Sequence, residues 1–97
     1  MIDSRVNEIL WTRRAIRDIE NIHRYLAQTN IEAARTTVSA IRKATQPLTY
    51  HAFIGRPGRR EGTRELVVLK TSFIVVYRVQ ENTVQIVRVL HGAQKYP

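Results

Sequence analysis

The sequence contains no cysteine, and only three histidines are scattered along its 97 residues. Without cysteine, neither a disulfide framework nor a thiolate metal site can support the fold. Three separated histidines do not make a zinc cluster, so we expect neither a metal nor another cofactor. A protein free of cysteine suits a reducing compartment, and the cytoplasm is the location that we expect.

Long apolar runs are also missing. Polar and charged side chains follow the N-terminal residues Met1 to Arg5, so the sequence predicts neither a signal peptide nor a membrane-spanning helix. A chain of this length buries roughly 60–65% of the surface of its unfolded form, which leaves nothing for a second core. We therefore expect one domain over residues 1–97, with one site or one binding face.

Positive charge is what the chain has in excess. Lysine and arginine number 16 against 8 acidic residues, a formal net charge of +8, and the only lysines are Lys43, Lys70 and Lys95. The planar guanidinium of arginine pairs bidentately with carboxylates and phosphates. This composition favours an acidic protein or a nucleic acid as partner, and charge alone does not choose between them.

Two helices are predicted in the first half of the chain, after a short strand from Val6 to Trp11. Thr12 can cap a helix from Arg13 to about Gln28, and Asn30 can cap a second helix that ends near Gln46, where Pro47 follows. Apolar residues recur at helical spacing at Ala15, Ile19, Ile22 and Leu26, and at Ile31, Ala34, Val38 and Ile41. The short connection between the helices forces an antiparallel hairpin, whose apolar face needs a sheet.

Three strands are predicted in the second half, over Thr63 to Leu69, Ser72 to Val79 and Thr83 to Leu90. Short polar turns join them, so they form an antiparallel meander and the fold class is α+β. Strict alternation along the last strand places on one face Val84, Ile86, Arg88 and Leu90. We expect one face of the sheet to pack on the helices and the other to carry arginines.

The segment from Tyr50 to Gly62 is predicted to be a loop, because glycine and proline interrupt it. It holds the densest positive cluster of the sequence, made of Arg56, Arg59 and Arg60, with Arg64 just inside the next strand. Such a cluster can grip an acidic partner or phosphates, and it can equally be the solvated surface of a basic protein.

The order of the elements, together with several short segments, resembles the RelE/ParE toxin superfamily. These segments are Trp11-Thr12 with Ala15 and Asp18-Ile19, Tyr25-Leu26, Gly55-Arg56, Gly62-Thr63-Arg64-Glu65-Leu66-Val67-Val68, Val76-Tyr77-Arg78-Val79 and Val87-Arg88-Val89-Leu90-His91-Gly92-Ala93-Gln94. The resemblance covers nearly the whole chain and implies a strand, a two-helix hairpin and an antiparallel meander. It also implies the toxin of a type II toxin–antitoxin system.

The resemblance implies one of two targets. RelE-like members cut messenger RNA on the ribosome, whereas ParE-like members poison DNA gyrase. RelE-like toxins carry catalytic lysines on the strand that here reads Leu66 to Leu69, and an arginine near the position of Ile74. Those charges are absent, so we expect a ParE-like gyrase poison, with a ribosome-dependent endonuclease as the alternative. An inactive relative kept as a binding module is a third possibility.

A metal-free ribonuclease needs a base, an acid and cationic groups around the phosphate. The residues of this chain that can supply them are Arg64, Arg78, Arg88, His91 and Tyr96. The opposing interpretation is that Arg78 and Arg88 are solvated neighbours across the sheet or pair with Glu65, and that His91 merely ends a strand.

Two further surfaces are predicted. Contacts to the target are expected from Arg56, Arg59, Arg60, Arg64 and Lys95. The antitoxin is expected to be a small, acidic, partly disordered and DNA-binding protein that contacts Ile16, Ile19, His23, Tyr25 and Val38 of the helices. Trp11 and Tyr25 are interpreted first as core residues. No membrane partner is expected.

Overall fold

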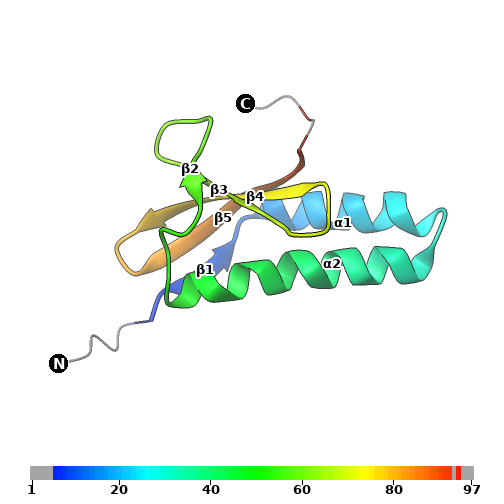
Figure 1. The fold of residues 1–97 in the computed structure, drawn as a ribbon, viewed down its shortest axis with the longest axis horizontal. Helices are drawn as coiled ribbons and strands as arrows, with labels where there is room; N and C mark the ends of the chain where they lie inside the picture. Colours follow the sequence, from blue (N-terminus) through cyan, green and yellow to red (C-terminus); the bar gives the residue numbers. More distant parts are fainter. Residues whose placement is uncertain (1–5, 93, 95–97) are drawn as a thin grey trace.

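The computed structural model describes residues 6–92 and residue 94, which form two helices and a five-stranded sheet (Figure 1). The elements are β1 (Glu8–Trp11), α1 (Arg13–Ala27), α2 (Ile31–Thr45), a 3-10 helix η1 (Gln46–Thr49), β2 (Arg56–Pro57), β3 (Arg64–Val67), β4 (Phe73–Gln80) and β5 (Thr83–His91). The predicted α+β class and the order of strand, helix hairpin and meander are confirmed. The two-residue strand β2 was not predicted.

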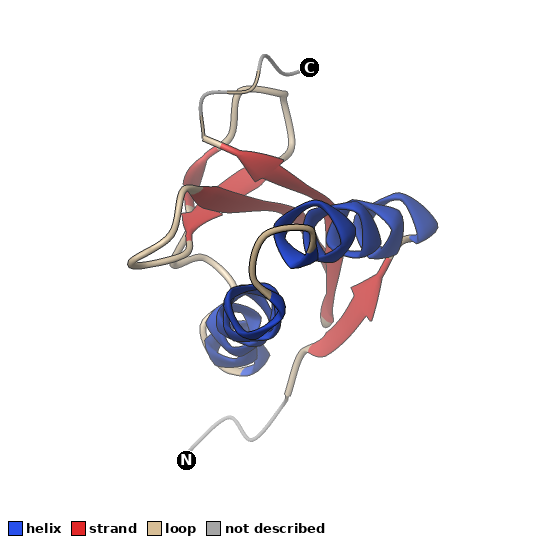
Figure 2. Ribbon diagram, turned by 90° about the vertical axis from the view of Figure 1, so that its right-hand side faces the viewer, coloured by secondary structure: helices blue, strands red, loops and turns tan. Residues whose placement is uncertain are grey.

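The two helices begin at the predicted caps. The Thr12 hydroxyl accepts a hydrogen bond from the Ala15 amide at 3.1 Å, and the Asn30 side chain accepts one from the Ala33 amide at 3.0 Å. A short turn joins the helices, which lie side by side (Figures 1 and 2). Within the part of the chain that the structure describes, no helix is long and apolar enough to cross a membrane.

The sheet is mixed, with the strand order β1-β5-β4-β3-β2. β1 runs parallel to β5, from Glu8 opposite Thr83 to Trp11 opposite Ile86, and all the other pairings are antiparallel. β2 pairs only Arg56 with Glu65 and Pro57 with Arg64 at the outer edge of β3. A strand of two residues has no periodicity, and proline is tolerated only at an edge, so no pattern along the chain marked it as a strand.

One prediction about β5 is wrong, because a bulge interrupts its alternation. The register shifts opposite Val76 and Tyr77, which face Arg88 and Ile86, so that Val87 is an extra residue. Val84 and Ile86 therefore pack in the core with Val89, whereas Arg88 and Leu90, opposite Val76 and Ile74, belong to the other face of the sheet. We call this second side the outer face.

The core lies between the helices and the inner face of the sheet. Its buried members include Ala15, Ile19, Ile41, Leu48, Val75, Tyr77, Val84, Ile86 and Val89. On the outer face Ile74, Val76 and Leu90 are also buried. Trp11 is partly buried against the core, as expected, but Tyr25 is 73% exposed, so its interpretation as a core residue is wrong. Tyr25 lies beside the apolar stripe near the C-terminal end of α1, where its side chain faces solvent.

Candidate functional site

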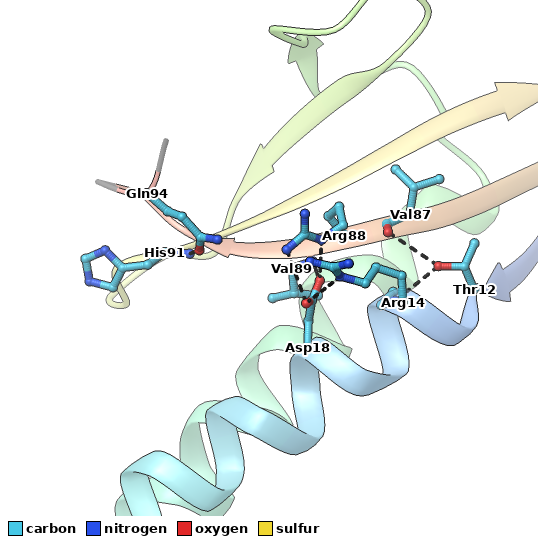
Figure 3. Close-up of polar contacts among 9 residues, drawn as sticks. Thr12, Arg14, Asp18, Val87, Arg88, Val89, His91 and Gln94 are labelled. Atoms are coloured by element: carbon cyan, nitrogen blue, oxygen red, sulfur yellow. Dashed lines mark hydrogen bonds and ion pairs between the residues drawn. The ribbon is translucent and has the colours of Figure 1, made fainter. Parts of the chain in front are cut away.

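A buried carboxylate on α1 closes the open edge of β5 (Figure 3). β1 pairs with β5 only as far as Ile86. Beyond it, Asp18 Oδ2 accepts a hydrogen bond from the Val89 amide at 2.9 Å and another from Arg88 Nε at 2.8 Å. Arg14 Nε lies 3.6 Å from Asp18 Oδ1. The side chain thus replaces a strand as the partner of this edge and neutralises an arginine at the same time.

A groove of about 680 Å³ runs beside this ion pair, between the second half of α1 and the ends of β4 and β5. Apolar side chains in its lining are Ile22, Tyr25, Leu26, Phe73 and Val89. Polar ones are Arg14, Asp18, Asn21, Ser72, Arg88, His91 and Gln94. A lining that combines apolar side chains with hydrogen-bonding groups suits an amphipathic peptide better than a small charged substrate.

A second hollow, of about 630 Å³, lies on the other flank of α1 and reaches α2. Three residues predicted to bind the antitoxin line it, namely Ile19, His23 and Val38. Tyr25 lines the first groove, and Ile16 is 43% exposed on the same helix. The five residues therefore lie around α1, although they do not share one pocket.

A second buried carboxylate, Glu65 on β3, holds the arginine-rich loop. Its Oε2 accepts hydrogen bonds from the backbone amide and from Nε of Arg59, both at 3.0 Å, and its Oε1 accepts one from Arg56 at 3.2 Å. Burial by itself raises the pKa of Glu65, but the hydrogen bonds from Arg59 and Arg56 outweigh it and leave the pKa below its usual value. Glu65 is therefore a carboxylate at neutral pH.

The same loop reaches the C-terminal segment. Arg59 donates a hydrogen bond to the Gln94 carbonyl at 3.3 Å, and Arg60, one residue on, is exposed. The structure thus brings together two of the regions predicted to contact the target. Lys95 and Tyr96, which belong to the same predictions, lie outside the described residues.

Arg64 lies apart from the other arginines of this cluster. It pairs with Tyr77 across the sheet, and its neighbour Glu65 pairs with Val76, so the two side chains point to opposite faces. Arg64 donates to the Gly55 carbonyl at 2.7 Å and to the Phe53 carbonyl at 3.3 Å. Tyr77 anchors the same segment, because its hydroxyl donates to the Ala52 carbonyl at 2.8 Å and accepts from the Gly55 amide at 2.9 Å.

The candidate nuclease residues that the structure describes do not form one cluster. His91 pairs with Phe73 at one end of the hairpin, and its ring meets the Phe73 ring edge-on at 5.7 Å. At about 3.4 Å per residue, the five positions from Phe73 to Arg78 place the exposed Arg78 about 17 Å along the strand. Arg88 faces Val76 and binds Asp18, and Glu65 binds Arg56 and Arg59, so the alternative in which Arg88 or Arg78 pairs with Glu65 is wrong.

Sequence reasoning missed Asp18 and Glu65 as the organising residues of the two polar regions. A signal for Asp18 was present, because position 18 falls between Ala15 and Ile19 on the buried stripe of α1. A carboxylate on a buried face needs a cationic or hydrogen-bonding partner. Nothing comparable marked Glu65, since alternation along a short strand does not say which face is covered.

Comparisons with known proteins agree with this architecture. Residues 9–96 match the family described as the ParE toxin of the type II toxin–antitoxin system parDE. The chain is 37% identical over 89 residues to the candidate toxin Y4kP of Sinorhizobium fredii, covering 92% of each protein. It is 31% identical over 87 residues to Toxin RelE2 of Caulobacter vibrioides, covering 90% of this chain and 97% of that one.

Solved structures show the same fold. A chain from the chromosomal ParDE toxin–antitoxin system of P. aeruginosa matches with a TM-score of 0.81 and 28% identity, over 91% of this chain and 98% of that one. The toxin–antitoxin complex RelBE2 from Mycobacterium tuberculosis matches with a TM-score of 0.66 and 24% identity, over 89% of this chain and 98% of that one.

Proposed function

Because the chain belongs to the ParE toxin family of type II toxin–antitoxin systems, we propose that it inhibits DNA gyrase and that a cognate antitoxin holds it inactive. One observation carries the choice of gyrase over RNA cleavage. The polar residues that could cleave RNA are dispersed: Arg88 is bound to Asp18, and Arg78 lies at the far end of β4 from His91. An inhibitor that acts by binding needs no such convergence.

The antitoxin is proposed to cover α1. The groove between α1 and β5 offers apolar side chains such as Ile22 and Leu26, and the hollow on the other flank is lined by Ile19, His23 and Val38. An acidic segment that is disordered alone can fold across both, since a chain with a net charge of +8 attracts it over a long range. The neighbours include toxin–antitoxin complexes such as RelBE2, which supports a partner of this kind.

The target surface is proposed to lie on the outer face around Arg56, Arg59 and Arg60, and Lys95 of the C-terminal segment, which lies outside the described residues, is proposed to contact the target as well. The bond between Arg59 and the Gln94 carbonyl supports it, because this bond joins the loop to that segment. Arg64 was also predicted to bind the target, but its bonds to the carbonyls of Phe53 and Gly55 support a role in holding the loop.

A ribosome-dependent endonuclease remains the second candidate. It is favoured by the 31% identity to Toxin RelE2 and by the presence of His91 in the lining of the larger groove. In that case the His91 ring would act as acid or base, because histidine is the side chain most often used in acid–base catalysis.

The two candidates are separated by adding the toxin, freed from its antitoxin, to a gyrase supercoiling assay and to a cell-free translation extract. Loss of supercoiling with accumulation of cleaved DNA, while translation continues, is the expected result. Arrested translation with cut messages and undisturbed supercoiling would replace the gyrase proposal by the endonuclease. The variant His91→Ala sharpens the assignment, because it should abolish only the second activity.

A further inference from the structure

We propose that Glu65 is a positioning residue that sets the arginine loop, residues 56–62, for a protein partner rich in carboxylates. The inference rests on the proposed function and deepens it, since it names what shapes the target surface and which chemistry that surface recognises. It is carried by the burial of one carboxylate that binds two arginines, Arg56 and Arg59, on the outer face of the sheet.

Glu65 is placed to fix the backbone of the loop as well as its side chains. Its side chain is 2% exposed, and it accepts the Arg59 amide directly. The loop is closed just beyond this point, where the Gly58 amide donates to the Thr63 carbonyl at 2.7 Å and the Thr63 hydroxyl donates to the Arg60 carbonyl at 2.6 Å. The carboxylate thus joins a tight turn to the central part of the sheet.

Arg59 extends this order to the C-terminal segment. Its Nε binds Glu65 Oε2 while one terminal nitrogen binds the Gln94 carbonyl. The fork geometry of guanidinium allows both bonds at once, which a lysine ammonium at the same place could not reproduce. Glu65 is therefore linked through Arg59 to Gln94, beyond the end of β5.

The exposed arginines of this face indicate the class of partner. Glu65 binds Arg56 and Arg59, yet their side chains are still 59% and 36% exposed, and Arg78 is exposed on the same face. Guanidinium groups that are already oriented bind carboxylates with a smaller loss of side-chain entropy than flexible arginines would. Among the groups of a protein surface, aspartate and glutamate fit this arrangement.

The test compares Glu65→Gln with Glu61→Gln in the full chain, both prepared as complexes with the antitoxin and then released. Both substitutions remove one carboxylate from the loop region, but Glu61 is exposed and Glu65 is buried. We expect Glu65→Gln to weaken gyrase inhibition about tenfold, because removing one partner of a buried charge pair leaves the arginines misplaced. Glu61→Gln should inhibit like the wild type, and antitoxin affinity should stay the same in both.

Two further measurements distinguish a loss of order in the arginine loop from a loss of folding in the whole domain. In the antitoxin complex, amide hydrogen exchange at Arg59 should accelerate in Glu65→Gln while exchange in α1 stays unchanged. Arg59→Lys keeps the net charge on an exposed side chain, so it should remain folded, yet it should inhibit more weakly than the wild type because lysine cannot make both bonds.

Wild-type inhibition by both Glu65→Gln and Arg59→Lys would overturn the role of Glu65. Inhibition that is weakened equally by Glu61→Gln would overturn it too, since the effect would then be one of net charge. If the wild type spares gyrase and arrests translation, the proposed function fails, and the same variants are then ranked by translation arrest. Binding of the wild type to short DNA or RNA, with no binding to gyrase subunits, would overturn the carboxylate-rich protein as the partner.

Discussion

Asp18 and Glu65 are two buried carboxylates with similar local chemistry, but their partners lie at different distances along the sequence. Each accepts one backbone amide and at least one arginine side chain. The partners of Asp18 on β5 lie 70 and 71 positions away in sequence, whereas those of Glu65 lie 6 and 9 positions away. The first carboxylate therefore ties the helical layer to the sheet, and the second shapes only its own surroundings.

The comparison teaches that burial of a charge does not by itself predict its effect on stability. A long-range link is lost only when the fold opens, so its energy counts in global unfolding. A local link can break while the rest of the domain stays folded, and its energy then appears as local order. We expect substitutions at Asp18 to act on stability and those at Glu65 to act mainly on the shape of one surface.

The largest effect is expected for Asp18→Ala. It leaves Arg88, whose side chain is 17% exposed, and the Val89 amide without their partner, and breaking such a buried pair typically costs about 3–5 kcal/mol. Urea unfolding followed by circular dichroism measures this loss. Glu20→Ala, on the exposed side of the same helix, is the control and should change stability by less than about 0.5 kcal/mol. Equal stability of the two variants would refute the long-range role of Asp18.

A smaller effect is expected for Tyr77→Phe, which removes an uncharged anchor of the segment next to the arginine loop. The Gly55 amide and the Ala52 carbonyl lose their buried partner, which costs about 1–3 kcal/mol. No charge is involved, so the loss measured at low and at high salt should be the same. The exposed Tyr50→Phe serves as the control. A strong salt dependence in Tyr77→Phe would mean that charge, through Arg64, dominates this anchor as well.

The pH dependence of Glu65 sharpens the contrast further. Its pKa is lowered in the folded state, so the unfolded chain binds the proton more tightly. The stabilisation by Glu65 is therefore complete above its usual pKa of 4.5 and is lost as pH falls through the lower folded value. The difference in stability between wild type and Glu65→Gln should shrink on acidification in this range. A difference that grows there would contradict the direction of the shift.

The smallest effect on stability is expected for Arg78→Ala, on the outer face. Arg78 is exposed and lies opposite Gln85, so the free energy of unfolding should change by less than about 0.5 kcal/mol. Inhibition of the target should nevertheless weaken, and should fall more steeply with salt, if the outer face binds an acidic surface. Gyrase assays at two salt concentrations measure this. An unchanged salt response would place the contact elsewhere.

Much of the fold could be predicted because local signals and tertiary packing agree. The side chains of Thr12 and Asn30 cap the helices as expected, and the three long strands were found from their apolar content. The bulge at Val87 could not be found in this way, because nothing in the run from Thr83 to His91 marks an extra residue. The predicted face of Arg88 was wrong for that reason alone.

The candidate site was predicted less well than the fold. The sequence located the arginine loop, but the division of its arginines between two faces depends on the pairing of Arg64 with Tyr77. Likewise, the partner of Arg88 is an aspartate 70 positions away, which periodicity cannot reveal. Local patterns identify which residues carry charge, whereas the register of the sheet decides which charges meet.

The extra residue at Val87 acts as a switch of parity for the end of β5. If Val87 were paired regularly instead, strict alternation would turn every later side chain to the opposite side. Val89 would leave the core, Arg88 would point toward the apolar layer, and the Val89 amide that Asp18 binds would face β4 instead of α1. A chain shortened by Val87 would need no bulge, because the direct succession of Ile86 and Arg88 already places the following side chains on the faces that they occupy here.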